Sequence, residues 1–351
     1  MNHQAMDWFE RLTGFRESTG KGGYEQTRQR FELEGSSLRS RVNQRSFGIG
    51  QLSLVAMGSL REQARQGPPV PGRSRLRIVH GDVRQLHQRP EYAGALFQVA
   101  SQFNLLEMVG ETVTPEHGVT GYQYDHTQGP ACAIAAGAAT IYRNYFAPVG
   151  QQIGQTAELQ LDGFADLGGA LALALGQPAA SLWTMRNGYA MFTRQGVDSM
   201  SNYIASLDPP ALDLLRQRLK IGLHRDVEVT DGDSHNLPGP TVSQAYCSAL
   251  PVAYNRGDTS GADWAPLAGL VLDAAYEATV WAAVINAQRG ASNIVLLTML
   301  GGGVFGNDPA WIRAAIARAC RQVAASGLDI VLVSRDPPGA EMKRWVETLP
   351  N

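Results

Sequence analysis

The chain has few cysteines and little net charge. Its 351 residues include three cysteines and carry a formal net charge of −2. Cys132, Cys247 and Cys320 are widely spaced and form no Cys-x-x-Cys pair, so neither a structural zinc site nor a disulfide framework is expected. His80 and His126 show no metal-ligand spacing either, and neither does His235. We therefore predict no metal and no cofactor, and we expect the three thiols to be reduced and buried.

The sequence also lacks the features of a nucleic-acid or membrane protein. Near-neutral charge argues against a dedicated nucleic-acid binder, which would carry a basic surface. The longest apolar stretches are interrupted and rich in alanine and glycine, so no membrane span is expected. The first ten residues contain no apolar signal-peptide segment. These observations favour a cytoplasmic protein with neither a nucleic-acid nor a membrane partner.

What the chain does have is a strand, a glycine loop and a helix in succession between residues 293 and 323. The aliphatic run 294–297 is typical of a buried strand. A loop of sequence Gly-Gly-Gly-Val-Phe-Gly-Asn follows at 301–307. Asp308 is then a good N-cap, and Pro309 fits the first helical position. Backbone N–H groups of such a loop, with the partial positive charge of the helix N-terminus, form an anion site that most often binds phosphate.

The spacing of the glycines also fits a second kind of site. Gly301, Gly303 and Gly306 satisfy the G-x-G-x-x-G pattern of dinucleotide-binding proteins, which expects an acidic residue about 20 positions later. Asp336 lies 30 positions after Gly306 and no second βαβ half follows it, so an NAD-dependent oxidoreductase is kept only as an alternative. No Lys-Ser/Thr follows the glycines, which excludes a Walker A loop. A turn needed only for packing would rarely use three consecutive glycines, each costing roughly 0.5–1 kcal/mol against alanine.

Strands and helices alternate along most of the chain. Strands are expected at 76–82, 95–101, 219–230, 242–250 and 328–333, with one or two more within 47–57. Helices are expected at 131–146, through much of 147–220, and at 265–288. This alternation predicts an α/β fold in three layers, with a mixed, mostly parallel sheet covered on both faces. We place an N-terminal extension at 1–73, packed on a core at 74–351 that carries a helical insertion at about 147–220.

Three further loops follow predicted strands and are expected near the glycine loop. Gly81-Asp82 closes one strand, the segment 99–104 closes the next, and the segment 125–132 opens the alanine-rich helix. Ligands of such sheets bind beyond the carboxyl ends of the strands. A second helix N-terminus at this edge strengthens the prediction of a diphosphate ligand.

The order and spacing of these segments resemble the macrodomain family over about residues 75–335. The resemblance rests on Gly-Asp-Val at 81–83, a strand ending in Asn104, a loop opening a helix, and a strand followed by Gly-Gly-Gly-Val-Phe-Gly. It implies a macrodomain-like fold that binds ADP-ribose, and some macrodomains hydrolyse ADP-ribosyl bonds. The chain departs from the usual Val-x-Asn-Ala-Ala-Asn at 99–104, and from Val-Asp-Gly-Ala-Ile at 125–130. It looks more like a divergent branch of effectors that remove ADP-ribose from an arginine of ubiquitin, which would act in a host cytosol.

The resemblance also implies which residues contact ADP-ribose. Asp82 would accept a hydrogen bond from the adenine amino group, and Asn104 would contact the distal ribose. The backbone of 302–306 would cradle the diphosphate, with Phe305 beside the distal ribose. The predicted ligand contacts are Asp82, Val83, Asn104, Gln128, Gly129, Gly302, Gly303, Val304, Phe305, Gly306 and Asn307.

Candidate catalytic residues follow from the chemistry. Cleaving a glycosidic bond at the distal ribose needs stabilisation of an oxocarbenium-like centre and activation of a water, commonly by one or two carboxylates. Asp125 is the first candidate, with a turn or capping role as the alternative. Glu107 could orient a water or a ribose hydroxyl, or be a surface helix residue. Asp226 alternates with apolar neighbours on a strand and could face the cleft, although an edge-strand charge is the plainer explanation.

Two functional classes remain open. One is a hydrolase that removes ADP-ribose from a protein side chain, with arginine as the favoured linkage and ubiquitin as a candidate carrier. The other is a module that binds ADP-ribose without turnover. Glu277, on an apolar helix, is expected to pair with an arginine rather than to act in catalysis. Trp183 and Tyr189 are candidates to cover the adenine or meet a protein substrate, and a local core is the alternative.

Overall fold

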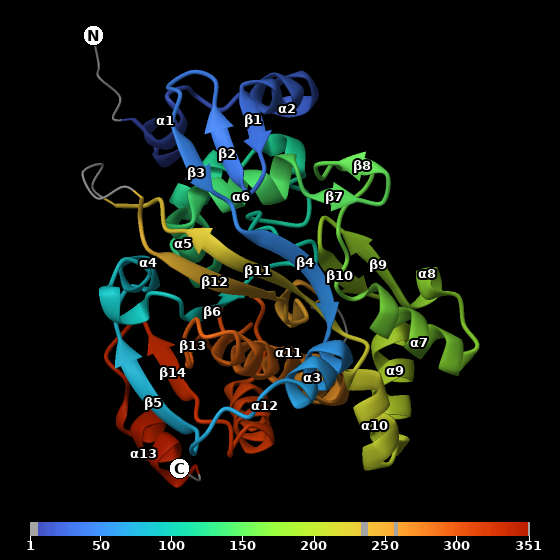
Figure 1. Ribbon diagram of the computed structural model, residues 1–351. Coiled ribbons are helices and arrows are strands. Elements are labelled where there is room, and N and C mark those ends of the chain that lie inside the picture. Colours follow the sequence, from blue (N-terminus) through green and yellow to red (C-terminus); the bar gives the residue numbers. More distant parts are fainter. Residues whose placement is uncertain (1–5, 233–237, 256–258, 350–351) are drawn as a thin grey trace.

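A seven-stranded sheet forms the centre of the computed structural model, which describes residues 6–232, 238–255 and 259–349 (Figure 1). Its strands, in spatial order, are β4 (Gln51–Ala56), β11 (Lys220–Glu228), β12 (Thr241–Cys247), β6 (Leu96–Ala100), β13 (Ile294–Leu297), β14 (Asp329–Ser334) and β5 (Arg75–His80). From β12 to β5 all neighbours pair in parallel, and β11 alone runs against both of its neighbours. The predicted mixed, mostly parallel sheet is confirmed.

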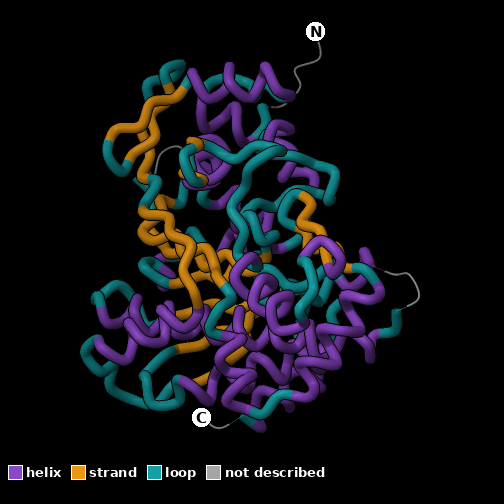
Figure 2. Tube along the Cα trace, turned by 90° about the vertical axis from the view of Figure 1, so that its right-hand side faces the viewer, coloured by secondary structure: helices purple, strands orange, loops and turns teal. Residues whose placement is uncertain are grey.

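Helices cover both faces of the sheet, as the perpendicular view in Figure 2 also shows. One face packs on α11 (Gly261–Gln288), α3 (Met57–Gln66) and α12 (Pro309–Gln322). The other packs on α4 (Val83–Leu86), α5 (Gln128–Ala135) and α6 (Gly137–Tyr145). Neighbouring residues of β13 show the two faces, because Val295 and Leu297 join the first core and Leu296 joins the second. The predicted three layers are therefore present.

The N-terminal part contributes to two separate hydrophobic cores. Helices α1 (Trp8–Thr13) and α2 (Gly20–Gln29) and the small sheet of β1 (Phe31–Glu34), β2 (Ser37–Ser40) and β3 (Ser46–Gly48) share a separate core with α6. Strand β4 and helix α3 belong instead to the central unit, as an edge strand and a core helix. The boundary placed at residue 73 therefore falls after elements that already belong to the core.

The insertion contains more β-structure than the sequence predicts. It holds the short pair β7 (Pro148–Val149) and β8 (Gln152–Ile153), then α7 (Ala165–Leu175) and α8 (Ala179–Leu182). A hairpin of β9 (Trp183–Arg186) and β10 (Tyr189–Phe192) follows, and α9 (Arg194–Ser206) and α10 (Pro209–Arg216) complete it. A further helix, α13 (Ala340–Thr348), ends the described chain and has no counterpart among the predicted elements.

The alanine-rich helix predicted at 131–146 is broken into α5 and α6. Ala136 leaves the helical region with φ −112° and ψ 58°. The N–H of Gly137 donates to Thr230 Oγ1 (2.9 Å), and the hydroxyl of Thr140 donates to the carbonyl of Ala133 (2.6 Å). These bonds replace intrahelical ones, so the two helices take different directions. The partner at position 230 is remote in sequence, and the helical pattern alone gave no sign of it.

Helix α11 is the central core helix. Within the described chain it alone is long and apolar enough to cross a membrane, but 89% of its most apolar window is buried. All three cysteines are free thiols, with Cys132 and Cys247 buried and Cys320 partly exposed.

A buried ion-pair network joins α11 to its neighbours. The fully buried carboxylate of Glu277 accepts hydrogen bonds from Arg61 of α3 (2.6 Å) and from Arg318 of α12. Arg61 also binds both carboxylate oxygens of Asp213 on α10 (2.7 and 2.8 Å). Burial opposes ionisation of Glu277, but hydrogen bonds from Arg318 and Trp281 outweigh it and lower the pKa. The expected pairing of Glu277 with an arginine is confirmed.

We predict that Glu277→Ala lowers the free energy of unfolding by about 3–5 kcal/mol, because it leaves two arginines without their buried partner. Urea denaturation measures the change. Glu62→Ala, at an exposed position of α3, is the control and should change stability by less than about 0.5 kcal/mol. Equal stability of the two variants would show that the network contributes little.

Candidate functional site

A cavity of about 450 Å³ opens at the carboxyl ends of β6 and β13. Its walls come from the loop after β6, the segment that leads into α5 and the glycine loop after β13. Tyr189 and Tyr254 complete them. The described residues that line it are Ala100, Ser101, Gln102, Glu107, Met108, Val109, Tyr124, Asp125, His126, Thr127, Gln128, Gly129, Pro130, Tyr189, Ala249, Tyr254, Thr298, Met299, Leu300, Gly301, Gly303, Val304 and Phe305. This is the edge of the sheet at which the sequence places the ligand.

The cavity opens where strands β6 and β13 separate. Their pairing covers only Leu96 and Phe97 of β6. Beyond it, the side chain of Gln128 bonds to the free edge of β6: Oε1 accepts from the N–H of Ala100 (2.9 Å), and Nε2 donates to the carbonyl of Gln98 (2.8 Å). Gln128 therefore lines the cavity as predicted, but its amide is engaged in closing the sheet edge.

Two glycines of the loop are required by the fold. Gly301 and Gly306 have φ of 74° and 69°, a region that favours glycine. A Cβ at Gly301 would lie 2.5 Å from the Cβ of Ala249. Asn307 locks the loop, since its N–H donates to the carbonyl of Gly301 (3.0 Å) and its Nδ2 to that of Leu250 (2.8 Å). Asn307 is thus a support of the loop and does not line the cavity.

Gly303 differs from these glycines. Its φ lies outside the left-handed region, and a Cβ there would meet no atom within 4 Å. Within the described part of the chain, no hydrogen bond engages the N–H groups of Gly303, Val304 or Phe305. The absence of a side chain at Gly303 therefore has no packing reason and leaves these donors accessible from the cavity.

The first turn of α5 supplies further donors to the same cavity. The first N–H groups of a helix have no intrahelical acceptor, and their dipoles favour an anion. The N–H of Thr127 is taken by Asp125 Oδ1 (2.9 Å). A Cβ at Gly129 would lie 1.9 Å from the carbonyl oxygen of Ala100 and 3.1 Å from Cγ of Glu107. Glycine at this position lets the helix start lie directly against the end of β6.

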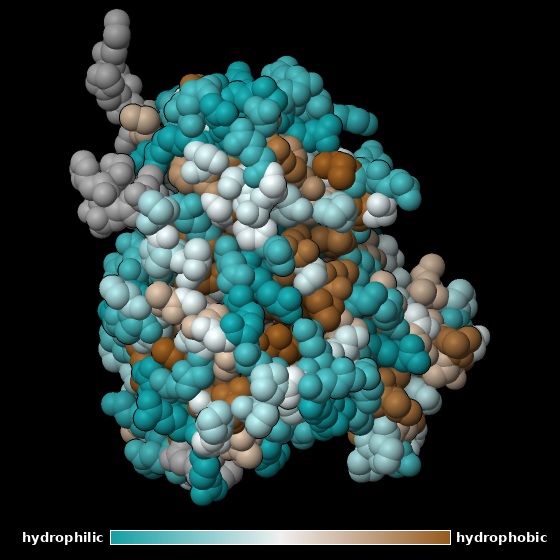
Figure 3. All heavy atoms as spheres, in the orientation of Figure 1, coloured by the Kyte–Doolittle hydropathy of each residue, from teal (hydrophilic) through white to brown (hydrophobic). Residues whose placement is uncertain are grey.

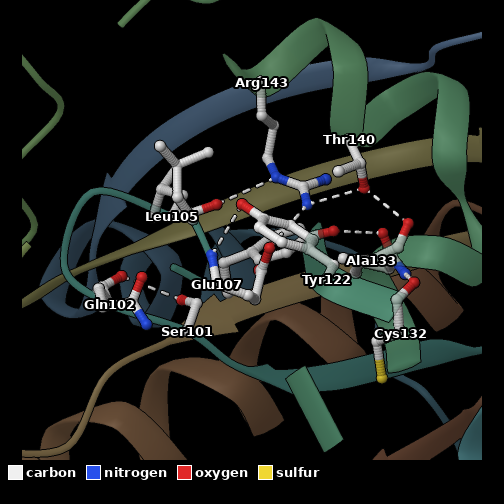
Figure 4. A network of polar contacts seen from close by, with 12 residues as sticks. Ser101, Gln102, Leu105, Glu107, Tyr122, Cys132, Ala133, Thr140 and Arg143 are labelled. Carbon is white, nitrogen blue, oxygen red and sulfur yellow. Dashed lines mark hydrogen bonds and ion pairs between the residues drawn. The ribbon is translucent and has the colours of Figure 1, made fainter. Parts of the chain in front are cut away.

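Glu107 is the buried carboxyl group of the cavity (Figure 4). It is 2% exposed, its Oε2 lies 3.5 Å from Nη2 of Arg143, and its Oε1 has no hydrogen-bond partner in the described chain. Its N–H donates to the hydroxyl of Tyr122 (3.1 Å). Burial raises the pKa of Glu107 to about 8, although Arg143 and Tyr122 act in the opposite direction. At neutral pH this carboxyl group is largely protonated and can donate a proton.

Arg143 holds Glu107 in place and is itself fully buried (Figure 4). Its Nε donates to the carbonyl of Leu105 (3.1 Å) and its Nη2 to Thr140 Oγ1 (3.1 Å). Its guanidinium lies 3.9 Å from the ring centroid of Tyr246. Leu105 has φ 66°, a strained conformation for a side chain of this kind. The strain is located where the carbonyl of Leu105 meets the arginine.

Aromatic rings form another wall. The ring centroids of Tyr189 and Phe305 lie 5.5 Å apart, those of Tyr189 and Tyr254 5.5 Å, and those of Tyr254 and Phe305 5.8 Å. Tyr189 is fixed by donating its hydroxyl to the carbonyl of Met108 (2.9 Å). Its pKa is raised by burial first, and then by the charges of neighbouring groups that include Asp125. The wall is suited to pack against a sugar or a base.

The chain is similar to poly(ADP-ribose) glycohydrolases of known structure. The enzyme from Thermomonospora curvata bound to the inhibitor ADP-HPD shares 14% identity, with 92% of this chain and 94% of that chain covered and a TM-score of 0.42. The enzyme from Deinococcus radiodurans in complex with ADP-ribose shares 14% identity, with 84% and 90% covered and a TM-score of 0.42. No family model and no curated protein matches the chain. Function is therefore inferred from the groups that line the cavity.

Seven of the predicted site residues line the cavity. They are Glu107, Asp125, Gln128, Gly129, Gly303, Val304 and Phe305. Gly302 and Gly306 belong to the same loop without lining it. Asp82 is exposed and caps α4 by accepting from the N–H of Arg84 (2.8 Å). Val83 is the first residue of α4, and its side chain is buried. Neither lines the cavity, and the adenine contact of Asp82 stays a prediction.

Two predicted roles are corrected by the structure. Asn104 is fully buried: its Nδ2 donates to Gln160 Oε1 (2.8 Å) and its Oδ1 accepts from the N–H of Leu106 (3.1 Å). Its amide is thus used to fold the loop and does not face a ribose. Asp226 lies at an irregularity of β11, outside the cavity, where both carboxylate oxygens pair with Arg289 at 2.8 Å. It is an edge-strand charge, so the catalytic prediction for Asp226 is wrong.

Sequence reasoning missed Arg143 and Tyr122, and it did not place Tyr254. A signal for Arg143 was available, because an arginine in an alanine-rich, apolar helix is costly to bury unless it is paired. Across residues 6–232, 238–255 and 259–349, no group of three His, Cys, Asp or Glu side chains could hold a metal ion. His235 lies outside the described residues.

We predict that alanine destabilises the protein at one glycine of the cavity and is tolerated at another. Gly129→Ala places a methyl group against the carbonyl of Ala100 and should lower the free energy of unfolding by about 1–3 kcal/mol. Gly303→Ala meets open space and should stay within about 0.5 kcal/mol of the parent. Thermal and urea unfolding measure both. A destabilised Gly303→Ala would mean that packing also dictates this glycine.

Proposed function

We propose that the protein is a hydrolase that cleaves the glycosidic bond between ADP-ribose and a modified protein side chain, with arginine as the favoured linkage. The observation that carries the proposal is Glu107. A buried carboxyl group with a raised pKa faces a cavity that also offers two sets of backbone N–H donors. Shifted carboxyl groups in a cleft of this kind are typical of general acids.

ADP-ribose fits the donors of the cavity. The N–H groups of 303–305 and of the first turn of α5 would bind the diphosphate, as helix starts and glycine loops do. The ring of Phe305, in the wall with Tyr189 and Tyr254, would pack beside the distal ribose. The volume is within the range of small-ligand pockets, roughly 300–1,000 Å³. Asp82, at the end of β5, is proposed to meet the adenine amino group.

The proposed reaction uses two carboxyl groups. Glu107 gives its proton to the leaving nitrogen as the bond from the anomeric carbon to that nitrogen breaks. A water adds its oxygen to the anomeric carbon, and Asp125 accepts the proton that the water loses. Arg143 stabilises the carboxylate left on Glu107. Solvent then returns the proton from Asp125 to Glu107, so the enzyme is restored. One acid and one base on either side of the scissile bond is the general pattern of glycoside hydrolysis.

A reader that binds ADP-ribose without turnover is the second candidate. The observation in its favour is that Oδ1 of Asp125 already accepts the N–H of Thr127 and that Glu107 is paired with Arg143. Both carboxyl groups would then serve only to shape the cavity. Ubiquitin, the carrier implied by the resemblance to the effector branch, is the first modified protein to test.

We predict that Gly303→Glu abolishes ADP-ribose binding and leaves the fold intact. The Cβ of the new side chain has open space around it, and the added carboxylate would meet the diphosphate with like charge. Isothermal titration calorimetry and the ligand-dependent shift of the melting temperature measure the effect. Gly22→Glu, at an exposed helical glycine with equally open space, is the matched control and should bind as the parent does. Binding by Gly303→Glu at parental affinity would show that the glycine loop is misassigned, and NAD-dependent hydride transfer by the parent would support the oxidoreductase.

We predict that Glu107→Gln and Asp125→Ala each lower the single-turnover rate on arginine-ADP-ribosylated protein by about 10²–10⁴. ADP-ribose affinity should stay within a few-fold of the parent. Since Glu107 acts as an acid with a pKa of about 8, the parental rate should fall as the pH rises through about 8. This alkaline limb should persist in Asp125→Ala and be absent from the residual rate of Glu107→Gln. A parent that binds ADP-ribose but turns over no arginine, serine or glutamate linkage would be a reader.

A further inference from the structure

Large apolar side chains stand exposed at the mouth of the cavity. Val109, Tyr124 and Val304 are 70%, 78% and 61% exposed, and all three line the opening. They come from three separate loops: the one after β6, the one before α5, and the glycine loop. Exposed large apolar groups that cluster at a functional opening mark a contact surface. We call these three residues the rim.

The charged groups near the rim are the carboxylates of Asp125 and Glu111 and the guanidinium of Arg335. Among the described residues that line the cavity there is no lysine or arginine, whereas Glu107 and Asp125 are present. Glu111 lies close enough for its charge to act on Tyr189 and Tyr254. Arg335 reaches the same loop, but its Nη1 donates to the carbonyl of His126. A leaving group at this mouth thus meets apolar groups and two carboxylates, with one guanidinium held at the carbonyl of His126.

This chemistry discriminates between two kinds of leaving group. In poly(ADP-ribose) the leaving group carries further diphosphates, which the carboxylates of Glu111 and Asp125 repel. In a modified protein the leaving group is a side chain of a folded surface. A cationic guanidine is attracted by the same carboxylates, and an apolar patch around it can pack on the rim.

We propose that the rim is the docking surface for the folded protein that carries a single ADP-ribose on a cationic side chain, and that it selects this substrate over poly(ADP-ribose). The inference rests on the proposed hydrolase function and adds to it the surface that binds the carrier protein and the selection against the polymer. Val109 and Tyr124 contact the carrier protein next to the modified side chain. The ADP-ribose portion binds deeper, on the backbone donors.

The test compares a protein-linked substrate with a small one. The double variant Val109→Ser with Tyr124→Ser is assayed on arginine-ADP-ribosylated ubiquitin and on the conjugate of ADP-ribose with free arginine. We expect kcat/KM on the modified protein to fall at least tenfold, through KM. On the small conjugate, kcat/KM should stay within twofold, as should the Kd of free ADP-ribose.

The matched control is Leu173→Ser with Leu214→Ser. These leucines are 84% and 62% exposed and lie on α7 and α10, outside the cavity, where apolar atoms are visible at the right-hand side of Figure 3. The control should leave all three quantities unchanged. An equal loss on the modified protein in the control would overturn the rim as the docking surface. So would an equal loss of the double variant on both substrates, or no loss at all.

Polymer turnover tests the selectivity. Poly(ADP-ribose) should be cleaved at least tenfold less efficiently than the modified protein, and Glu111→Gln should reduce that gap. Cleavage of the polymer at a higher kcat/KM than the modified protein would overturn the proposal. If the parent binds ADP-ribose but turns over neither substrate, the hydrolase function fails separately. In that case, binding affinity tests whether the rim is a docking surface. Modified ubiquitin should bind more tightly than free ADP-ribose, and the double variant should remove that difference.

Discussion

The buried pair of Glu107 and Arg143 organises the site. A guanidinium and a carboxyl group removed from water are costly unless each finds partners, and Arg143 finds them in the carbonyl of Leu105, the hydroxyl of Thr140 and the ring of Tyr246. Those partners lie in a strained loop, in α6 itself and in the central sheet. Because the segment 128–145 is broken into α5 and α6, its two helices point in different directions and take different roles. Helix α5 directs its N-terminus at the cavity, and α6 carries the arginine that fixes the acid.

The N-terminal extension supports the same cavity from outside. The carboxylate of Glu17 accepts from the N–H groups of Val119 and Thr120 and from the hydroxyl of Tyr145, at 2.7–2.9 Å. Trp8 adds a bond from its ring N–H to the carbonyl of Thr120 (3.2 Å). These contacts anchor the segment that leads to Tyr124 and Asp125. The extension thus holds the loop that carries the proposed base, even though none of its described residues, 6–73, lines the cavity.

Local signals in the sequence were enough for the glycine loop and much of the sheet. The strand at 294–297, the cap at Asp308 and the helix start at Pro309 depend on neighbours within a few residues, and the structure confirms all three. The predictions for Asn104 and Asp226 failed because their partners are distant. Gln160 belongs to the insertion, and Arg289 follows α11. The hydrophobic pattern of one segment cannot predict a hydrogen bond to a residue that is distant in the sequence.

Among the described residues that line the cavity, backbone N–H groups are without acceptors and no lysine or arginine is present. Backbone N–H groups carry only partial charges, so they could hold a diphosphate without placing a full positive charge beside Glu107. A lysine or arginine on the cavity wall would lower the pKa of Glu107 and remove the proton that the proposed reaction needs. Arg143 already acts in that direction, and burial outweighs it. Gly303 supports the same conclusion, because its missing side chain serves no packing need and keeps the donors open. The site therefore places backbone N–H donors beside a carboxyl group whose pKa is raised, and a cationic side chain on the cavity wall would oppose that rise.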